Sequence, residues 1–205
     1  MAEGFELIQA GRERQKLQDE VVHRWYQFVL AYPDHLVPEM LERFGIGPDS
    51  IVLDPFCGTG TTLVECKKLG IASVGIDANP ASVLASRAKT DWNLDSDLVE
   101  ALCHYVLAEV GPVSETFLLS DTPLFARGQD LAGLRASLLQ QSPEGRYLIR
   151  SGMIERQWID EIPFYISLAL LAQIKALDAD PRYIQLLRLA LASCIVETVA
   201  NVRFG

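Results

Sequence analysis

The sequence has no apolar run long enough to cross a membrane. Its longest uninterrupted apolar stretches include residues 168–172 and 189–192, far short of the roughly 18 residues that a spanning helix requires. Residues 4–20 are mostly polar, so the charged start and apolar stretch that form a secretory signal are also missing. These absences predict a soluble protein of the cytoplasm.

The sequence also has no closely spaced pair of cysteines. Cys57, Cys66, Cys103 and Cys194 are scattered along the chain, whereas zinc ribbons and redox motifs place their cysteines only a few residues apart. We therefore expect no metal site, and reduced thiols that are mostly buried. Cys57 lies in the most informative loop, but no histidine lies near it in the sequence to activate it as a nucleophile.

A basic stripe is missing as well. The chain carries 18 Lys and Arg residues against 27 Asp and Glu residues, a formal net charge of −9. Domains that bind nucleic acid unaided usually cluster their basic side chains, because affinity for phosphate rests on them. The nearest cluster, Arg12, Arg14 and Lys16, is typical of a solvated helix face. Any role on nucleic acid would therefore need help from outside this chain.

What the sequence does have is enough apolar material for a packed core. Of its 205 residues, 49% are hydrophobic, which excludes a disordered chain and predicts one domain that needs no disulfide. Alternation of strands and helices begins at residue 51 and then gives way to helices. The apolar spacing predicts strands over residues 51–53 and 71–76, a loop over 142–145, and helices over 5–30, 38–44, 61–69, 81–90, 97–110, 131–140, 162–177 and 183–202.

The segment around the two predicted strands carries the chemistry. The first strand ends at Asp54 and the second at Asp77, and open α/β sheets bind ligands at the carboxyl ends of their strands. Gly58 and Gly60 permit a tight turn that brings backbone N–H groups close to a ligand. The next helix begins at Thr61, so its positive dipole end points into the same crevice. Since Asp77 could accept both hydroxyls of a ribose, these features predict a nucleoside-binding unit.

Two phosphate-binding motifs do not fit this segment. A P-loop needs a lysine after its second glycine, where this chain has Thr61. A dinucleotide fingerprint needs its third glycine at the position of Leu63. Asp54 would also repel a pyrophosphate, but it suits a cationic ligand with an amino group. S-adenosylmethionine has that amino group and a sulfonium.

The motif Asp-Pro-Phe-Cys-Gly-Thr-Gly-Thr-Thr over residues 54–62, with Gly-Ile-Asp-Ala-Asn-Pro over residues 75–80, resembles the cofactor motifs of S-adenosylmethionine-dependent methyltransferases. Within these it most resembles the amino-methylating DNA methyltransferases, which make N6-methyladenine or N4-methylcytosine. Their pattern Asp-Pro-Phe-x-Gly-x-Gly-Thr-Thr is matched in full. The resemblance is specific over residues 51–80 and looser over 21–50, and only a general helical likeness remains over 155–205.

The resemblance implies a set of cofactor-binding residues. Asp54 would bind the methionine amino group, Asp77 would hold the ribose hydroxyls, and Ala78 would lie against the adenine. The loop residues would surround the methionine moiety, with Thr61 capping the following helix: Pro55, Phe56, Gly58, Gly60 and Thr61.

The same family carries a catalytic motif that this sequence lacks. That motif is Asp, Asn or Ser followed by Pro-Pro and an aromatic residue, and it holds the target amino group while its ring stacks on the flipped base. The 205 residues contain no Pro-Pro dipeptide. We therefore expect no catalytic residue here, and no methyl transfer without a C-terminal half. DNA would be a partner only through that missing or separate half.

Three interpretations remain open from the sequence. The chain is the cofactor-binding part of a DNA methyltransferase, a free-standing cofactor-binding protein without methyl transfer, or part of an RNA methyltransferase. In each case the expected fold is α/β and Rossmann-like, with an incomplete parallel sheet and a largely helical C-terminal half. Within a single partial domain, we expect N-terminal helices over 1–50, the βαβ core over 51–96 and helices over 97–205. The apolar helices over 162–177 and 183–202 predict packing on the absent half or self-association.

Overall fold

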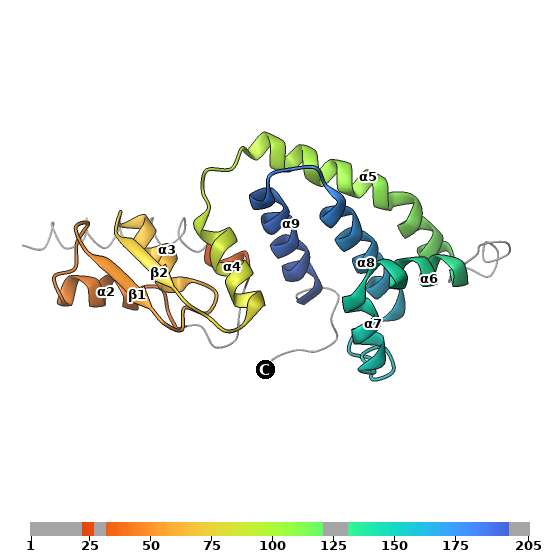
Figure 1. The fold of residues 1–205 in the computed structure, drawn as a ribbon, viewed down its shortest axis with the longest axis horizontal. Helices are drawn as coiled ribbons and strands as arrows, with labels where there is room; N and C mark the ends of the chain where they lie inside the picture. The colour runs from red at the N-terminus through yellow and green to blue at the C-terminus, as the bar shows by residue number, and fades with distance from the viewer. Residues whose placement is uncertain (1–21, 27–31, 121–130, 197–205) are drawn as a thin grey trace, which may run out of the picture. The chain divides into compact units, whose positions relative to one another are not determined.

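The computed structural model of this chain describes residues 22–26, 32–120 and 131–196. The chain divides into two compact units, Met1–Trp92 and Asn93–Gly205 (Figure 1). This division falls close to the boundary expected between residues 96 and 97. The single partial domain expected over the whole chain stays a prediction.

The N-terminal unit contains the two predicted strands. β1 spans Ile51–Asp54 and β2 spans Ala72–Gly75. They form a two-stranded parallel sheet in which Ile51 lies opposite Ala72. The parallel, side-by-side arrangement is therefore confirmed, and an incomplete α/β fold is compatible with it. The Rossmann-like arrangement needs more than two strands and stays a prediction.

Three helices accompany this sheet. α2 spans Leu36–Arg43, α3 spans Thr61–Lys68 and α4 spans Pro80–Thr90. α3 joins β1 to β2 and packs on both strands, while α2 and α4 each pack against α3. A small core holds α2, α3 and the start of β2 together: Val37, Leu41, Cys66 and Ile71.

One face of the sheet is open in the part of the chain that the structure describes. Val52 packs into the core beside α3, and neighbouring residues of a strand point to the opposite face. On that opposite face Ile51 is 75% exposed, Leu53 61% and Val74 52%. Leu53 lies opposite Val74 in the register, so these apolar side chains form a continuous patch.

The C-terminal unit is built of helices. Its central helix, α8, packs against α5, α6 and α9 (Figure 1). The helices of this unit are α5 (Ser96–Ser120), α6 (Leu131–Gln141), α7 (Pro143–Arg150), α8 (Glu161–Ala176) and α9 (Pro181–Cys194).

Aromatic side chains form the centre of this helical unit. The ring of Tyr165 stacks on Phe117 with centroids 5.4 Å apart and meets Phe164 edge-on at 5.3 Å. Leu168 and Ala169 of α8 belong to the same buried cluster. The apolar character of the predicted helix over 162–177 is thus accounted for largely by packing inside its own unit. Self-association through this helix stays a prediction.

One sequence expectation for this unit was wrong, and another gave a helix that was too short. The residues Ser142-Pro-Glu-Gly145 were expected to form a loop, but Ser142 caps α7, accepting a hydrogen bond from the N–H of Gly145 at 3.0 Å. The helix expected over 97–110 continues to Ser120, with Pro112 inside it. The predicted helix over 5–30 lies outside the described residues except for 22–26, as does the end of the one over 183–202.

The four cysteines are free thiols, as expected. Cys57 and Cys66 are buried, Cys103 is half-buried and Cys194 is exposed, so burial holds for two of them. Among the described residues, no helix combines the length and the apolar character that crossing a membrane requires.

Candidate functional site

The parallel pairing brings the two predicted acidic residues to the same edge of the sheet. Asp54 is the last residue of β1, and Asp77 follows β2 by two positions. Hydrogen bonds continue past the strands, since Ile76 donates its N–H to the carbonyl of Asp54 at 2.9 Å. Both carboxylates therefore lie at the carboxyl ends of neighbouring strands, where the sequence placed the ligand crevice.

The glycine loop is attached to this edge by the second carboxylate. Asp77 Oδ2 accepts a hydrogen bond from the N–H of Gly58 at 2.9 Å, and its Oδ1 accepts one from Asn79 at 2.7 Å. The N–H of Cys57 donates to the carbonyl of Ile76 at 3.0 Å. Asp77 thus fixes the loop to β2 while each of its oxygens keeps a lone pair for a further donor.

Gly60 makes the turn into α3 possible. It is the N-cap residue of α3 and has φ of 92°, a left-handed value that residues with a Cβ adopt only at a cost. Its N–H donates to the carbonyl of Cys57 at 2.8 Å. Thr61 is the first residue of α3 and is buried. The helix cap that the sequence placed at Thr61 is therefore Gly60, one residue earlier.

The other predicted cofactor residues lie on the same loops. Phe56 is 85% exposed, and its N–H donates to Asp54 Oδ1 at 3.0 Å. Pro55 and Ala78 are also exposed. Asn79 caps α4, its Oδ1 accepting from the N–H of Ala81 at 3.0 Å. The structure therefore gathers all eight predicted residues around one edge of the sheet.

Two polar residues join the site that the sequence did not assign to it. Thr62 Oγ1 donates to Asp54 Oδ2 at 2.5 Å, and Tyr32 OH makes a short hydrogen bond with Thr62 Oγ1 and also donates to Asp54 Oδ2 at 3.4 Å. Burial, followed by the nearby charge of Asp54, raises the pKa of Tyr32. Tyr32 and Thr62 both lie within the stretches that resemble the methyltransferase family. That resemblance was the one feature of the sequence that could have assigned them to the site.

The charge at this edge acts on Cys57. Burial is the largest cause that raises the pKa of the Cys57 thiol, and the negative charges of Asp54 and Asp77 raise it further. A thiol must lose its proton to act as a nucleophile or metal ligand. The side chain of Cys57 is 5% exposed and lies against Gly75 of β2, so it packs under the loop.

One group of potential metal ligands is present among the described residues. His23, Asp34 and Glu65 each offer an atom within 4.8 Å of the others. However, Glu65 Oε1 already bonds His23 Nε2 at 2.6 Å and accepts from the ammonium of Lys68 at 2.7 Å. Because a lysine already supplies the positive charge, this group is a polar link between residue 23 and α3 and carries no argument for a metal.

A buried lysine holds the same N-terminal segment against α4. Lys89 is 2% exposed and donates to the backbone carbonyls of His23 at 3.1 Å and Tyr26 at 2.7 Å. Burial lowers its pKa from 10.5 to about 8. The segment 22–26 is thus fixed both to α3 and to α4.

Comparison with known proteins assigns the N-terminal part of the chain. Residues 8–87 match the family model described as DNA methylase, of the N6/N4 type. The type II methyltransferase M.BsoBI of Geobacillus stearothermophilus is 36% identical over 81 residues, which are 38% of this chain and 16% of that protein. M.MjaII of Methanocaldococcus jannaschii is 38% identical over 76 residues, 37% of this chain and 14% of that protein. The N-terminal part of this chain is therefore a DNA N6/N4 methyltransferase-like fragment.

The similarity also reaches an enzyme named for an RNA. The tRNA (guanine(10)-N2)-dimethyltransferase of Methanothermobacter thermautotrophicus is 30% identical over 82 residues, 38% of this chain and 21% of that protein. The chain thus spans only about a fifth or less of the length of these relatives. No solved structure matches the chain.

Proposed function

We propose that this chain binds S-adenosylmethionine as the cofactor-binding part of a DNA (adenine-N6 or cytosine-N4) methyltransferase. The observation that carries the proposal is the convergence of Asp54 and Asp77 on one edge of a parallel sheet, with the loop of Gly58 and Gly60 between them. The family match over residues 8–87 supports the same interpretation. A Rossmann-like sheet, completed by strands from the rest of the enzyme, is part of this proposal.

The residues at this edge fit the chemistry of that cofactor. Asp77 is only half-buried, so its remaining lone pairs can accept the two ribose hydroxyls. Asp54 offers negative charge to the methionine ammonium, and Thr62 and Tyr32 orient its Oδ2. The cofactor supplies an electrophilic methyl group on a sulfonium. The protein's part is to bind and orient it, since positioning removes much of the entropic barrier to transfer.

Calorimetric titration with S-adenosylmethionine tests the proposal, and Asp77→Asn is the informative variant. Asparagine keeps one oxygen, which can accept the N–H of Gly58 or of Asn79 but not both, and it loses the second carboxylate acceptor for the ribose. A hydrogen bond to a charged group contributes roughly 1.5–3 kcal/mol, so affinity should fall about tenfold or more. Asp49→Asn, an exposed site on the same unit, should bind like the wild type. No binding by the wild-type chain, or equal affinity for Asp77→Asn, would contradict the proposal.

An RNA methyltransferase is the second candidate, and the tRNA-modifying relative favours it. Both candidates use the same cofactor site, so calorimetry does not separate them. Methyl transfer to mixed-sequence DNA and to tRNA, measured side by side with the chain and a polypeptide bearing the catalytic motif, separates them directly. Cofactor binding with no transfer to either would favour the free-standing cofactor-binding protein.

A further inference from the structure

The helical unit carries a basic stretch in an otherwise acidic chain. Residues 145–158 contain three arginines and one glutamate, whereas the whole chain has 18 basic and 27 acidic residues. Glu144, the acidic residue just before this stretch, is already paired, since its Oε1 accepts a hydrogen bond from the Lys175 ammonium at 2.6 Å. This hydrogen bond is the largest cause that lowers the pKa of Glu144. The arginines that follow are therefore not neutralised by the acid at the start of α7.

α7 presents a tyrosine and an arginine on one exposed face. Tyr147 is 66% exposed and Arg150 is also exposed, and residues three positions apart lie on the same side of a helix. Leu148 and Ile149, between them in the sequence, pack against the buried cluster of the unit. The apolar side of α7 is thus used for packing, and its polar side faces solvent.

The two arginines of α7 differ in how they are engaged. Nη1 of Arg146 donates to the carbonyls of Leu139 and Gln140, at 2.6 and 2.8 Å, and so satisfies the end of α6. The guanidinium of Arg150 has no hydrogen-bond or ion-pair partner in the part of the chain that the structure describes. Its donors therefore remain available to a ligand.

The turn that follows α7 holds a second pair of an aromatic ring and an arginine. The guanidinium carbon of Arg156 lies 5.3 Å from the ring centroid of Trp158, which is 42% exposed. The N–H of Trp158 donates to the carbonyl of Met153 at 3.0 Å, and Gln157 has φ of 57°, a left-handed value that is uncommon outside glycine. The next residue, Ile159, is buried in the core of the unit. Hydrogen bonding and packing thus hold this pair at the surface in one backbone geometry.

The exposed side chains of Tyr147, Arg150, Arg156 and Trp158, here called the α7 surface, all carry hydrogen-bond donors. Guanidinium groups form strong, charge-assisted hydrogen bonds with phosphate oxygens, and tyrosine hydroxyls also bind the DNA backbone. The exposed positions within residues 145–158 carry no Leu, Ile, Val or Met, whereas the buried centre of a protein interface is largely apolar. The chemistry of the α7 surface therefore favours nucleic acid over a protein partner.

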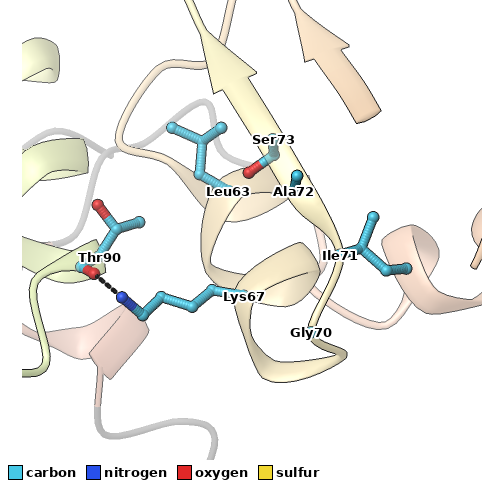
Figure 2. Close-up of a pocket in the computed structure, with 7 residues that line it drawn as sticks. All are labelled: Leu63, Lys67, Gly70, Ile71, Ala72, Ser73 and Thr90. Atoms are coloured by element: carbon cyan, nitrogen blue, oxygen red, sulfur yellow. Dashed lines mark hydrogen bonds between the residues drawn. The ribbon is translucent and has the colours of Figure 1, made fainter. Parts of the chain in front are cut away.

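The groove of the N-terminal unit lacks this chemistry. It has a volume of about 480 Å³ and lies between β2, α3 and the end of α4 (Figure 2). Its one cationic group among the described residues, the Lys67 ammonium, donates to the carbonyl of Thr90 at 2.6 Å and lies 5.1 Å from the ring centroid of Trp92. Leu63 and Ile71 line much of the rest. Unlike Arg150, this lysine is already engaged, so the groove offers no free donor to a phosphate.

We propose that the α7 surface binds the phosphate backbone of duplex DNA, so that the helical unit of this chain itself helps to hold the substrate. The choice of DNA rests on the proposed function, but the surface and its donors do not. The net charge of −9 opposes binding to a polyanion, so the contact is weak in the chain alone and adds to the grip of the remaining enzyme. Backbone contacts of this kind position a protein on DNA without reading its sequence.

The test is fluorescence anisotropy of a labelled, mixed-sequence DNA duplex of about 20 base pairs, titrated with the whole chain at low salt and without cofactor. The double variant Arg150→Gln with Arg156→Gln should weaken binding at least fivefold. It should also lower the slope of log affinity against log salt concentration by about two, because each lost phosphate contact contributes roughly 0.9. A purely structural role of these arginines would not change that slope.

A matched variant separates the α7 surface from the effect of net charge. Arg43→Gln with Arg188→Gln removes the same charge at two other exposed positions, and it should bind within about twofold of the wild type with an unchanged salt slope. No binding by the wild-type chain at millimolar protein, or equal weakening by the two double variants, would overturn the proposal.

Competition experiments test the choice of partner. Unlabelled DNA should displace the labelled duplex more effectively than duplex RNA of the same sequence or polyglutamate of the same total charge. Stronger displacement by the RNA, or by polyglutamate as a mimic of an acidic protein, would overturn DNA as the partner. Because no cofactor is added, failure here with normal calorimetry would reject only the DNA surface, and the reverse outcome would reject only cofactor binding.

Discussion

Gly60 and Ser86 approach so closely that a methyl group at residue 60 would lie 2.9 Å from Cβ of Ser86. Gly60 also has φ of 92°, so a side chain there would be strained in both its backbone and its packing. This contact fixes the distance between α4 and the start of α3. The geometry of the glycine loop and the packing of α4 are thus set by one residue.

We expect Gly60→Ala to destabilise the chain by about 2 kcal/mol or more, since left-handed backbone costs roughly 1–2 kcal/mol and overpacking adds to it. Urea unfolding measures the change. Gly47→Ala is the matched control, because a Cβ there meets nothing within 4 Å, and it should leave stability unchanged or slightly raised. Equal stability of the Gly60 and Gly47 variants would contradict this prediction, because it would show that the turn at residue 60 accommodates a side chain without cost.

Lys89 should make stability depend on pH in the alkaline range. Its pKa is lowered to about 8 in the folded chain from 10.5, so between these values the unfolded chain binds more protons and stability rises with pH. We expect the wild type to gain about 1–2 kcal/mol relative to Lys89→Met between pH 7.5 and 9.5. The difference between the two proteins removes the contribution of thiols, which titrate in both.

Urea unfolding at several pH values measures this difference. Lys175→Met, at a half-exposed site paired with Glu144, is the control and should follow the wild type across the same range. A wild-type advantage over Lys89→Met that stays constant with pH would contradict the lowered pKa of Lys89.

The aromatic cluster should dominate the stability of the C-terminal unit. Phe164 is 2% exposed and meets Tyr165 edge-on, so Phe164→Ala should cost about 3–5 kcal/mol. Tyr147→Ala removes an aromatic ring that is 66% exposed on α7 and should change stability by no more than about 0.5 kcal/mol. Thermal unfolding of both variants measures the two effects. Similar melting temperatures for the two variants would contradict a dominant contribution of Phe164 to the stability of this unit.

The chain alone should transfer no methyl group to DNA. Transfer needs an amino nitrogen aligned with the sulfonium methyl, and the base-holding motif of the family is not among these 205 residues. Incubation with labelled S-adenosylmethionine and mixed-sequence DNA should leave the DNA unlabelled, and a polypeptide bearing the Pro-Pro motif should restore labelling. Robust labelling by the chain alone would mean that it contains other catalytic residues.

The convergence of Asp54 and Asp77 could be predicted from the sequence, because parallel strands joined by a helix bring their carboxyl ends to one edge. The contact of Tyr32 with Thr62 could not, since these residues are separated by 30 positions and no local pattern links them. Only the packing of the segment before α2 brings them together.

The error over residues 142–145 has a different cause. Serine and proline were interpreted as a turn, although the same pair also begins helices as N-cap and first-turn residue. Gly145 strengthened the wrong interpretation, yet tertiary packing requires it, because a Cβ there would lie 2.7 Å from Leu168 Cδ1. The helix expected over 97–110 likewise continues further, because α5 passes through Pro112 to Ser120, and Thr116 Oγ1 donates to the Pro112 carbonyl at 2.8 Å.

The open apolar face of the sheet has a consequence for the synthesis of this protein. The N-terminal unit lies within the first 92 residues, and domains fold in order as they leave the ribosome. The nascent chain therefore presents Ile51, Leu53, Val74 and Ile76, all more than half exposed, before any later segment is made. Exposed apolar strands promote aggregation. This face is therefore a site of aggregation risk from the moment the N-terminal unit has been synthesised.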